Sequence, residues 1–313
     1  MIAMTEYIIE TENLVKHYRD VVALNGLNMR VKKGIHGFIG PNGAGKTTTI
    51  KILLNHIFPT AGNAYVFGHD VVKDTQKIRH RVGVLLERFS IPGDMTAISY
   101  LKFTARLYNL PTNDAEHRIR GLLDLLELSN VANREFGTFS AGMKRKLGFA
   151  AALISNPELV ILDEPTANID PASRMKIREV IRDYYKEFGT SFFISSHILT
   201  ELERICNTYS IIHQGTIIGE GTLEELKGKT SKSTYQIRVS DTRKLIDFLS
   251  TKEYVDELYN DELIITVIVN DTELFQTDLF SFLSSERLQL KLFHSIDDDL
   301  ENIFKHLIKV KGA

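Results

Sequence analysis

Residues 40–48, GPNGAGKTT, have the residue types and the spacing of a phosphate-binding loop. They fit the pattern G-x-x-x-x-G-K-[ST], whose backbone N–H groups surround phosphate oxygens and whose following helix adds a partial positive charge. Lys46 is expected to reach the β- and γ-phosphates of a nucleotide and assist catalysis, and the Thr47 hydroxyl to ligate Mg²⁺. The loop therefore predicts a nucleoside triphosphate site built from Gly40, Asn42, Gly43, Ala44, Gly45, Lys46, Thr47 and Thr48.

The flanks of the loop support this prediction. Residues 35–39 favour a short buried strand, and residues 49–57 carry apolar side chains at helical spacing. Strand, loop and helix in this order are the context in which the pattern binds phosphate. Residues 159–162, LVIL, predict a buried parallel strand that ends in Asp163 and Glu164.

Asp163, Glu164 and His197 are expected to complete the chemistry. Asp163 would supply a second contact to Mg²⁺, because this ion takes few carboxylates and keeps several waters. Glu164 points the other way along the strand and can polarise a water for in-line attack on the γ-phosphate. His197 follows a predicted strand at 191–196 and can hydrogen-bond the γ-phosphate or hold that water. Together they indicate nucleotide hydrolysis.

Two further features lie apart from the loop in the sequence. Tyr18 ends a predicted strand, where its ring can stack on an adenine or serve only as an ordinary strand residue. Ser140, Ala141 and Gly142 form a second small-residue loop that opens a helix, and a helix N-terminus can bind an anion. Because one nucleotide has one triphosphate, this second loop makes sense if it covers a nucleotide from the other side.

The elements that position these residues can be predicted from periodicity. Alternating residues favour strands at 7–10, 14–18 and 27–31, so an antiparallel patch precedes the phosphate-binding loop. Apolar residues at three- and four-residue spacing over 94–133 predict a helical insertion, within a helical subdomain at about 88–157.

The C-terminal part follows its own pattern. The polar stretch 227–233 predicts a linker, which divides the chain into domains 1–228 and 229–313. The second domain is expected to contain a strand, a helix, two strands, a helix and a strand, which is the ferredoxin-like order, followed by a last helix.

Composition excludes several classes of function. The net charge of −2 argues against a protein that binds nucleic acid through a basic surface. The one cysteine, Cys206, excludes an internal disulfide framework. The longest apolar runs fall far short of the ~20 residues that cross a bilayer, so we expect a cytoplasmic protein that reaches a membrane only through a partner.

In order and spacing, these motifs resemble those of the ATP-binding cassette (ABC) ATPases over residues 5 to about 225. The resemblance implies a P-loop NTPase core of the α/β class, with an antiparallel β subdomain and the helical insertion, followed by the small α+β domain. It also implies that two copies of the chain sandwich ATP, with Ser140, Ala141 and Gly142 contacting the nucleotide of the partner. The motifs are the Walker A loop (40–48), Walker B (159–164), the D-loop (167–170), the switch histidine His197, the aromatic A-loop residue Tyr18 and the signature (139–143).

Two residues depart from the family pattern. Ala141 replaces the first glycine of the usual Ser-Gly-Gly, which crowds the γ-phosphate of the partner or is harmless if φ is negative. Glu87 stands where the family usually has a glutamine; its carboxylate can still ligate Mg²⁺ but adds negative charge beside the phosphates.

The chain is most similar to separate-chain ATPases of daunorubicin-resistance-type and multidrug exporters. The resemblance implies export of drug, antibiotic or lipid-like substrates through an integral-membrane permease, whose coupling helix would contact residues 89–100. One alternative is a soluble cassette ATPase that acts on ribosomes or DNA. A second alternative is a nucleotide-gated regulatory module with negligible turnover.

Overall fold

The computed structural model describes residues 6–227, 233–261, 263–295 and 299–312. They form two compact units, Met1–Glu220 and Gly221–Ala313. The units divide ahead of the predicted domain boundary after residue 228, which itself lies outside the described residues together with most of the predicted linker. Within the described part of the chain, none of the helices is both long and apolar enough to cross a membrane.

A six-stranded sheet forms the centre of the first unit, with the strand order β10-β9-β3-β8-β7-β6. The strands β3, β6, β7, β8 and β9 pair in parallel, so their carboxyl ends meet at one edge. The residues of β3, β7 and β8 are all buried, as expected of a sheet covered on both faces. The bounds are β3 Ile35–Ile39, β6 Val82–Leu85, β7 Leu159–Asp163, β8 Ser191–Ser196, β9 Thr208–His213 and β10 Thr216–Gly221.

A second, antiparallel sheet of the first unit has the order β2-β1-β4-β5. The separate strands predicted at 7–10 and 14–18 were wrong, because one strand, β1, runs through both. Its register shifts between Thr11 and Leu14, and Asn13 between them has a φ of 47°, so a bulge interrupts the alternation that the sequence shows. The bounds are β1 Tyr7–Tyr18, β2 Val21–Lys32, β4 Ala61–Val66 and β5 His69–Asp70.

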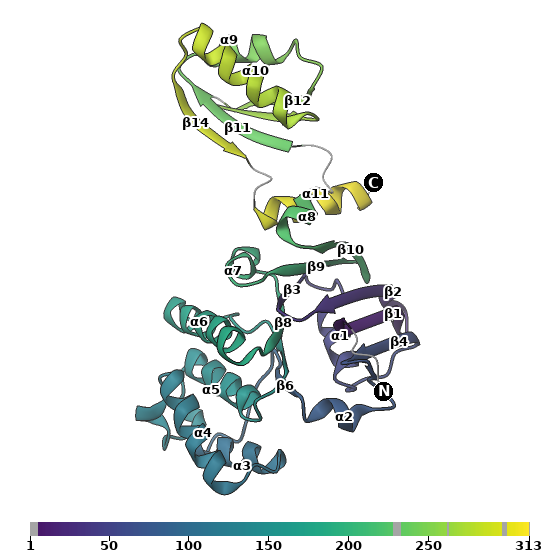
Figure 1. The fold of residues 1–313 in the computed structure, drawn as a ribbon, viewed down its shortest axis with the longest axis vertical. Coiled ribbons are helices and arrows are strands. Elements are labelled where there is room, and N and C mark those ends of the chain that lie inside the picture. The colour runs from purple at the N-terminus through teal and green to yellow at the C-terminus, as the bar shows by residue number, and fades with distance from the viewer. Residues whose placement is uncertain (1–5, 228–232, 262, 296–298, 313) are drawn as a thin grey trace. The chain divides into compact units, whose positions relative to one another are not determined.

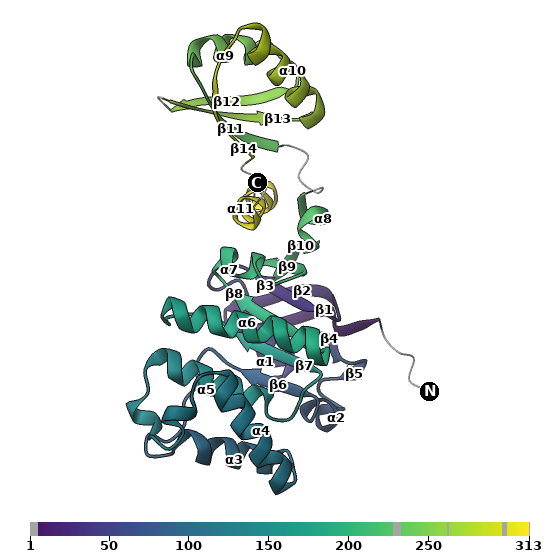
Figure 2. The same cartoon turned by 60° about the vertical axis from the view of Figure 1, so that its left-hand side comes forward.

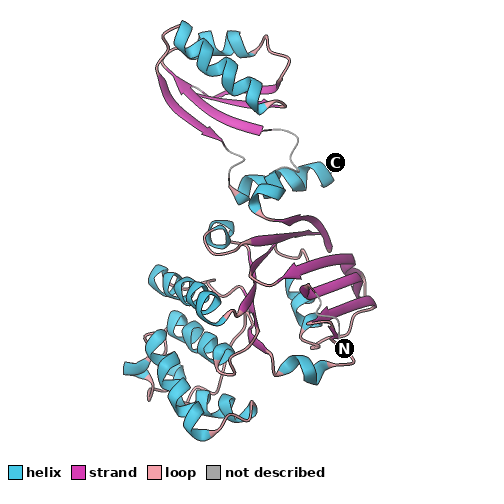
Figure 3. Ribbon diagram, viewed as in Figure 1, coloured by secondary structure: helices cyan, strands magenta, loops and turns pink. Residues whose placement is uncertain are grey.

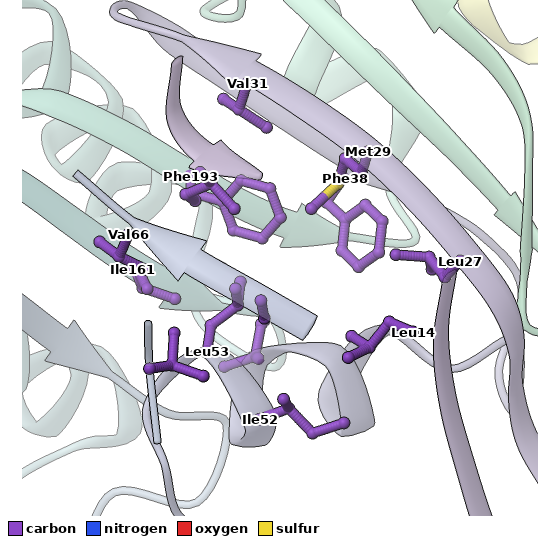
Figure 4. Close-up of a cluster of buried hydrophobic side chains, with 14 of the residues drawn as sticks. Leu14, Leu27, Met29, Val31, Phe38, Ile52, Leu53, Val66, Ile161 and Phe193 are labelled. Atoms are coloured by element: carbon purple, nitrogen blue, oxygen red, sulfur yellow. The ribbon is translucent and has the colours of Figure 1, made fainter. Parts of the chain in front are cut away.

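Helix α1 (Lys46–Leu53) packs between the two sheets, contacting β2 and β4 on one side and β7 on the other. Figure 4 shows the side chains that meet there, with Ile52 and Leu53 of α1 below Phe38 and Phe193 of the parallel sheet. Each fully buried side chain of this size contributes about 2 kcal/mol of hydrophobic stabilisation. This core therefore fixes the start of α1, where the phosphate-binding loop ends.

The opposite face of the six-stranded sheet carries helices α5 and α6 (Figures 1 and 2). The predicted insertion between β6 and β7 contains helices and loops and no strand among its described residues (Figure 3). Pro111 precedes α4, as the sequence indicates, and Thr96 caps α3 by accepting a hydrogen bond from the Ser99 N–H. The bounds are α2 Thr75–Arg79, α3 Ala97–Leu107, α4 Thr112–Leu125, α5 Ala141–Leu153, α6 Pro171–Phe188 and α7 Leu199–Glu203.

The second unit contains the predicted ferredoxin-like arrangement. Its four antiparallel strands have the order β12-β13-β11-β14, and α9 and α10 pack on the face formed by a core that includes Tyr235 and Phe275. A short helix, α8, precedes this domain and lies against the last helix, α11. The bounds are α8 Leu223–Lys227, β11 Ser233–Val239, α9 Thr242–Leu249, β12 Val255–Asp261, β13 Ile264–Val269, α10 Thr272–Ser285, β14 Leu290–Ser295 and α11 Leu300–Gly312.

Candidate active site

The phosphate-binding loop runs from the end of β3 to the start of α1. Gly43 and Gly45 have φ values of 81° and 112°, a backbone region that favours glycine. A Cβ on Gly45 would also lie 2.7 Å from the carbonyl oxygen of Ala23, so the loop has no room for a side chain there. Helix α1 begins at Lys46, and its N-terminal N–H groups therefore open onto the loop.

Lys46 is buried inside this loop. Its Nζ donates hydrogen bonds to the carbonyl oxygens of Gly40 at 2.7 Å and Pro41 at 3.2 Å. Desolvation lowers the pKa of the Lys46 amine, and the nearby carboxylates of Glu164, Asp163 and Glu87 oppose that shift. The cation is thus held at the centre of the loop, among three negative charges.

The Asp163 carboxylate is hydrogen-bonded to Thr47 and to Ser195. The Thr47 hydroxyl donates to Oδ2 of Asp163 at 3.2 Å, and the Ser195 hydroxyl donates to Oδ1. Ser195 reaches Asp163 because the two residues are partners in the parallel pairing of β7 with β8. Both oxygens of a carboxylate that is only 1% exposed are therefore hydrogen-bonded.

Glu164 pairs with His197. The Nδ1 atom of His197 lies 2.9 Å from Oε2 of Glu164, and the imidazole is half-exposed whereas the carboxylate is nearly buried. Glu164 also has a φ of 50°, which costs about 1 kcal/mol for a residue with a side chain. Its backbone N–H donates to the carbonyl oxygen of Ser195 at 3.0 Å, so neighbouring structure holds this conformation.

A cavity of about 270 Å³ brings most of the predicted residues together. Gly40 and Ala44 belong to the same loop without lining the cavity, and Asp163 lies beneath Thr47. Ala167 and Asn168 of the predicted D-loop line the cavity as well. Its other lining residues are Val21, Ala23, Pro41, Asn42, Gly43, Gly45, Lys46, Thr47, Thr48, Glu87, Glu164 and His197.

Tyr18 and the second small-residue loop do not line this cavity. Tyr18 lies at the end of β1, is 43% exposed, and has the Lys16 amine 5.1 Å from its ring centroid. An exposed ring of this kind is available for stacking, and its contact with adenine stays a prediction.

Ser140, Ala141 and Gly142, which we call the signature loop, form the start of α5. The Ser140 hydroxyl caps the helix by accepting a hydrogen bond from the Met143 N–H at 3.2 Å. Ala141 is exposed, lies in the first helical turn and is not among the residues with a positive φ, so its methyl group causes no backbone strain. Gly142 tolerates a larger side chain less well than residue 141 does, because a Cβ on Gly142 would lie 2.6 Å from Oδ2 of Asp170.

Glu87 follows β6, and its side chain is exposed at the cavity beside the phosphate-binding loop. Its carbonyl oxygen accepts a hydrogen bond from the guanidinium of Arg145 at 3.0 Å. Arg145 and Ser195 are residues near the site that the sequence did not reveal, as are Val21 and Ala23, which line the cavity. Arg145 and Ser195 make hydrogen bonds within the site. The partners of Arg145 and Ser195 lie on elements that are distant in the chain, so no local motif marks these two residues.

The donors present suit a Mg²⁺ ion that is held mainly by phosphates. The described residues contain no group of three or more His, Cys, Asp or Glu side chains that could hold a metal. Thr47 and Asp163 offer one hydroxyl and one carboxylate side by side. Mg²⁺ commonly uses one or two carboxylates together with substrate phosphates and waters, so this pair fits the ion.

Comparisons with known proteins agree with this geometry. The sequence model of the family described as ABC transporter matches residues 24–167. The chain is 31% identical over 304 residues to the bacitracin transport ATP-binding protein BcrA of Enterococcus faecalis, with 97% of each chain covered. It is 35% identical over 236 residues to the daunorubicin/doxorubicin resistance ATP-binding protein DrrA of Streptomyces peucetius, covering 75% of this chain and 71% of the relative.

A solved structure has the same fold as the cassette part of this chain. The solved structure described as a dimeric post-hydrolysis state of the ATP-binding cassette MJ0796 bound to ADP and Pi matches with a TM-score of 0.63 and 22% identity. The match covers 68% of this chain and 98% of the other. The chain therefore belongs to the ABC transporter family, as one of its ATP-binding and ATP-hydrolysing subunits.

Proposed function

We propose that this chain is the ATPase subunit of an exporter for antibiotics or other drug-like or lipid-like compounds, acting with a separate membrane permease at the inner face of the cell membrane. The observation that carries the proposal is the similarity to the bacitracin transport subunit along 97% of both chains, because it includes the C-terminal unit as well as the cassette. The daunorubicin-resistance relative points to the same class of substrate. These relatives do not favour the alternative of a ribosome- or DNA-associated ATPase.

The residues around the cavity have distinct roles in this proposal. Lys46 binds the β- and γ-phosphates, exchanging its loop carbonyls for phosphate oxygens. Thr47 and Asp163 would hold Mg²⁺, which would neutralise charge on the phosphates, and Glu87, which lines the same cavity, would add a further carboxylate. Glu164 accepts the proton of the attacking water, and His197 orients the carboxylate through their hydrogen bond.

Two copies of the chain are needed to enclose ATP. The signature loop opens a capped helix and does not line the cavity of its own chain, so its anion site is available to the nucleotide of a second copy. The solved cassette that this chain resembles in fold is a dimer, which supports the same assembly here. In each composite site, one chain then supplies the phosphate-binding loop and the catalytic side chains, and the other chain supplies the signature loop.

The permease would dock on the helical side of the cassette. A cavity of about 610 Å³ lies between the end of α1, α2, β6 and the end of α3. Apolar side chains such as Leu53 and Leu107 alternate there with His56 and Arg79, which suits a short amphipathic segment of a membrane protein. Residues 89–100, predicted to meet the coupling helix, do not line this cavity; they precede and begin α3, whose other end lines it.

The substitution Glu164→Gln tests the proposal. We expect turnover to fall by about a hundredfold or more while ATP binding persists, because the amide keeps the shape and loses the base. The variant should form a stable dimer with ATP in a sizing experiment and recover a polytopic membrane protein in a pull-down from cells. The matched control, Glu179→Gln on the exposed face of α6, should behave as the unmodified chain. A variant that stays monomeric with ATP, or that recovers ribosomes, would contradict the proposal.

A further inference from the structure

Arg145 links the catalytic carboxylate segment to two other parts of the site. Its Nη2 atom donates to the carbonyl oxygen of Glu164, and its Nη1 atom donates to the carbonyl oxygens of Leu86 at 2.8 Å and Glu87 at 3.0 Å. A single guanidinium therefore joins the segments that follow β6 and β7. These hydrogen bonds are directed at backbone atoms, so they fix the course of the chain and do not use the carboxylates of Glu87 and Glu164.

The position of Arg145 on α5 also connects it to the signature loop. Arg145 lies in the first half of α5, the helix that begins with the signature loop. A displacement of α5 therefore moves the donor that holds both other segments. The signature loop, Glu87 and Glu164 are thus tied together by one side chain within a single chain.

Burial makes this connection strong. Arg145 is 7% exposed, and an arginine that is removed from water requires full hydrogen bonding to compensate for its desolvation. Its planar fork reaches acceptors on two segments at once, which a lysine amine cannot reproduce. The segment that it holds includes Glu164, whose φ of 50° persists only if the surroundings hold it.

We propose that Arg145 is a positioning residue for ATP hydrolysis, which aligns the Glu164 backbone and the Glu87 segment with helix α5. The carboxylate of Glu164 then takes its catalytic position only when α5 is in place, so closure of the signature loop on a partner's nucleotide and hydrolysis in the same chain are coupled. The proposal rests on the ATPase activity of the family and does not depend on which compound is exported.

The first test separates kcat from nucleotide binding in the full-length chain. In Arg145→Met we expect kcat to fall by at least about tenfold while the Kd for ATP changes less than about twofold, because Lys46 and its loop are untouched. Arg145→Lys keeps the charge with one donor group, and we expect a loss of about fivefold in kcat with an unchanged KM.

The second test uses rescue. Arg145 lines a cavity of about 240 Å³, which gives a small cation access to the vacated position in Arg145→Ala. Millimolar guanidinium should restore kcat of this variant several-fold, whereas ammonium should not, because only guanidinium reproduces the forked donors. Hydrogen exchange should also rise together at residues 86–88 and 163–165 in the Arg145 variants.

Arg118→Met is the matched control. Arg118 in α4 is a partly buried arginine that likewise donates to a backbone carbonyl, that of Leu153 at 3.0 Å. Leu153 ends α5, so Arg118 anchors this helix at the end opposite the signature loop, whereas Arg145 bonds the segments after β6 and β7. We expect it to retain kcat. A folded Arg145→Lys chain with kcat within about twofold of the unmodified chain would overturn the proposal. So would a loss of kcat in Arg145→Met that is matched by an equal loss of ATP binding. If Arg145→Met or Arg145→Ala does not fold, Arg145→Lys decides.

Discussion

The phosphate-binding loop and the signature loop provide very different shares of a nucleotide site. The phosphate-binding loop shares one cavity with Glu164 and His197, and Asp163 is hydrogen-bonded to its Thr47. The signature loop offers a capped helix N-terminus and no catalytic side chain of its own. In the proposed dimer, one chain therefore carries the catalytic side chains and encloses one side of the nucleotide, and a second copy covers the other side.

The two loops also differ in how tightly glycine is required. Gly45 has a positive φ and a carbonyl within 2.7 Å of the position of a Cβ. In the signature loop this constraint falls on Gly142 alone, since Ala141 is exposed and without backbone strain. The departure from the family pattern at residue 141 is therefore located where the structure tolerates it.

Lys46→Ala should have the largest effect, because it removes the only amine at the centre of the phosphate-binding loop. We expect kcat to fall by about a thousandfold and ATP binding to weaken, measured by phosphate release and by equilibrium binding. Lys51→Ala, on an exposed position of the same helix, should leave both quantities unchanged. Retention of kcat within about threefold in Lys46→Ala would show that the loop is not where phosphate binds.

Gly142→Ala should have the next largest effect. The added methyl group meets Asp170, which caps α6, and must displace the first turn of α5. We expect about a tenfold loss of kcat with normal ATP binding by the single chain. Ala141→Gly, one residue earlier, should stay within about twofold of the unmodified chain. Equal effects of the two substitutions would contradict the distinction drawn between these positions.

Ser195→Ala removes the hydroxyl that holds Asp163 in place beside Thr47. We expect the Mg²⁺ concentration for half-maximal hydrolysis to rise by about threefold to tenfold, because partners behind a metal ligand orient it. Ser191→Ala lies at the other end of the same buried strand and should leave the Mg²⁺ titration unchanged. An unchanged titration in Ser195→Ala would show that Ser195 does not orient Asp163 for the metal ion.

His36 gives the smallest effect, and it concerns stability. It lies in β3, the strand that leads into the phosphate-binding loop, where Thr208 and Ser210 hydrogen-bond its two ring nitrogens. Burial lowers the pKa of His36 to about 3, so below pH 6.5 the unfolded chain takes up a proton that the folded chain does not. The free energy of unfolding should therefore fall by about 1 kcal/mol between pH 7 and pH 5.5 through this group.

His36→Gln should remove this part of the pH dependence. Urea unfolding of both chains at the two pH values measures the difference. The same dependence on pH in His36→Gln would show that other groups cause it.

The sequence was sufficient to predict those parts of the structure that depend on a local pattern of residues. The phosphate-binding loop, the two acids at the end of β7 and the order of elements in the second unit follow from spacing and periodicity. The bulge within β1 was missed because an extra residue there breaks the alternation of side chains. Helix α8 was missed because five residues are too few to show helical periodicity.

Contacts between distant segments could not be predicted. Ser195 reaches Asp163 only through the register of β8 on β7, and a shift of one residue would point it to the other face. Arg145 has backbone carbonyls as its acceptors, and these carry no sequence signal. The expectation that Glu164 and His197 act together did follow from their places after two strands, and the structure brings them within 2.9 Å.

The central claim is that each ATP site is shared between two copies, and a mixed dimer tests it most directly. Lys46→Ala disables the phosphate-binding loop, and Ser140→Arg blocks the signature loop. In a dimer that contains one chain of each kind, both defects fall in the same composite site and the other site is intact. With the two chains carrying different affinity tags and purified in tandem, we expect about half of the hydrolysis rate of the unmodified dimer, although each variant alone is inactive. A mixed dimer as inactive as its two parents would contradict the shared site.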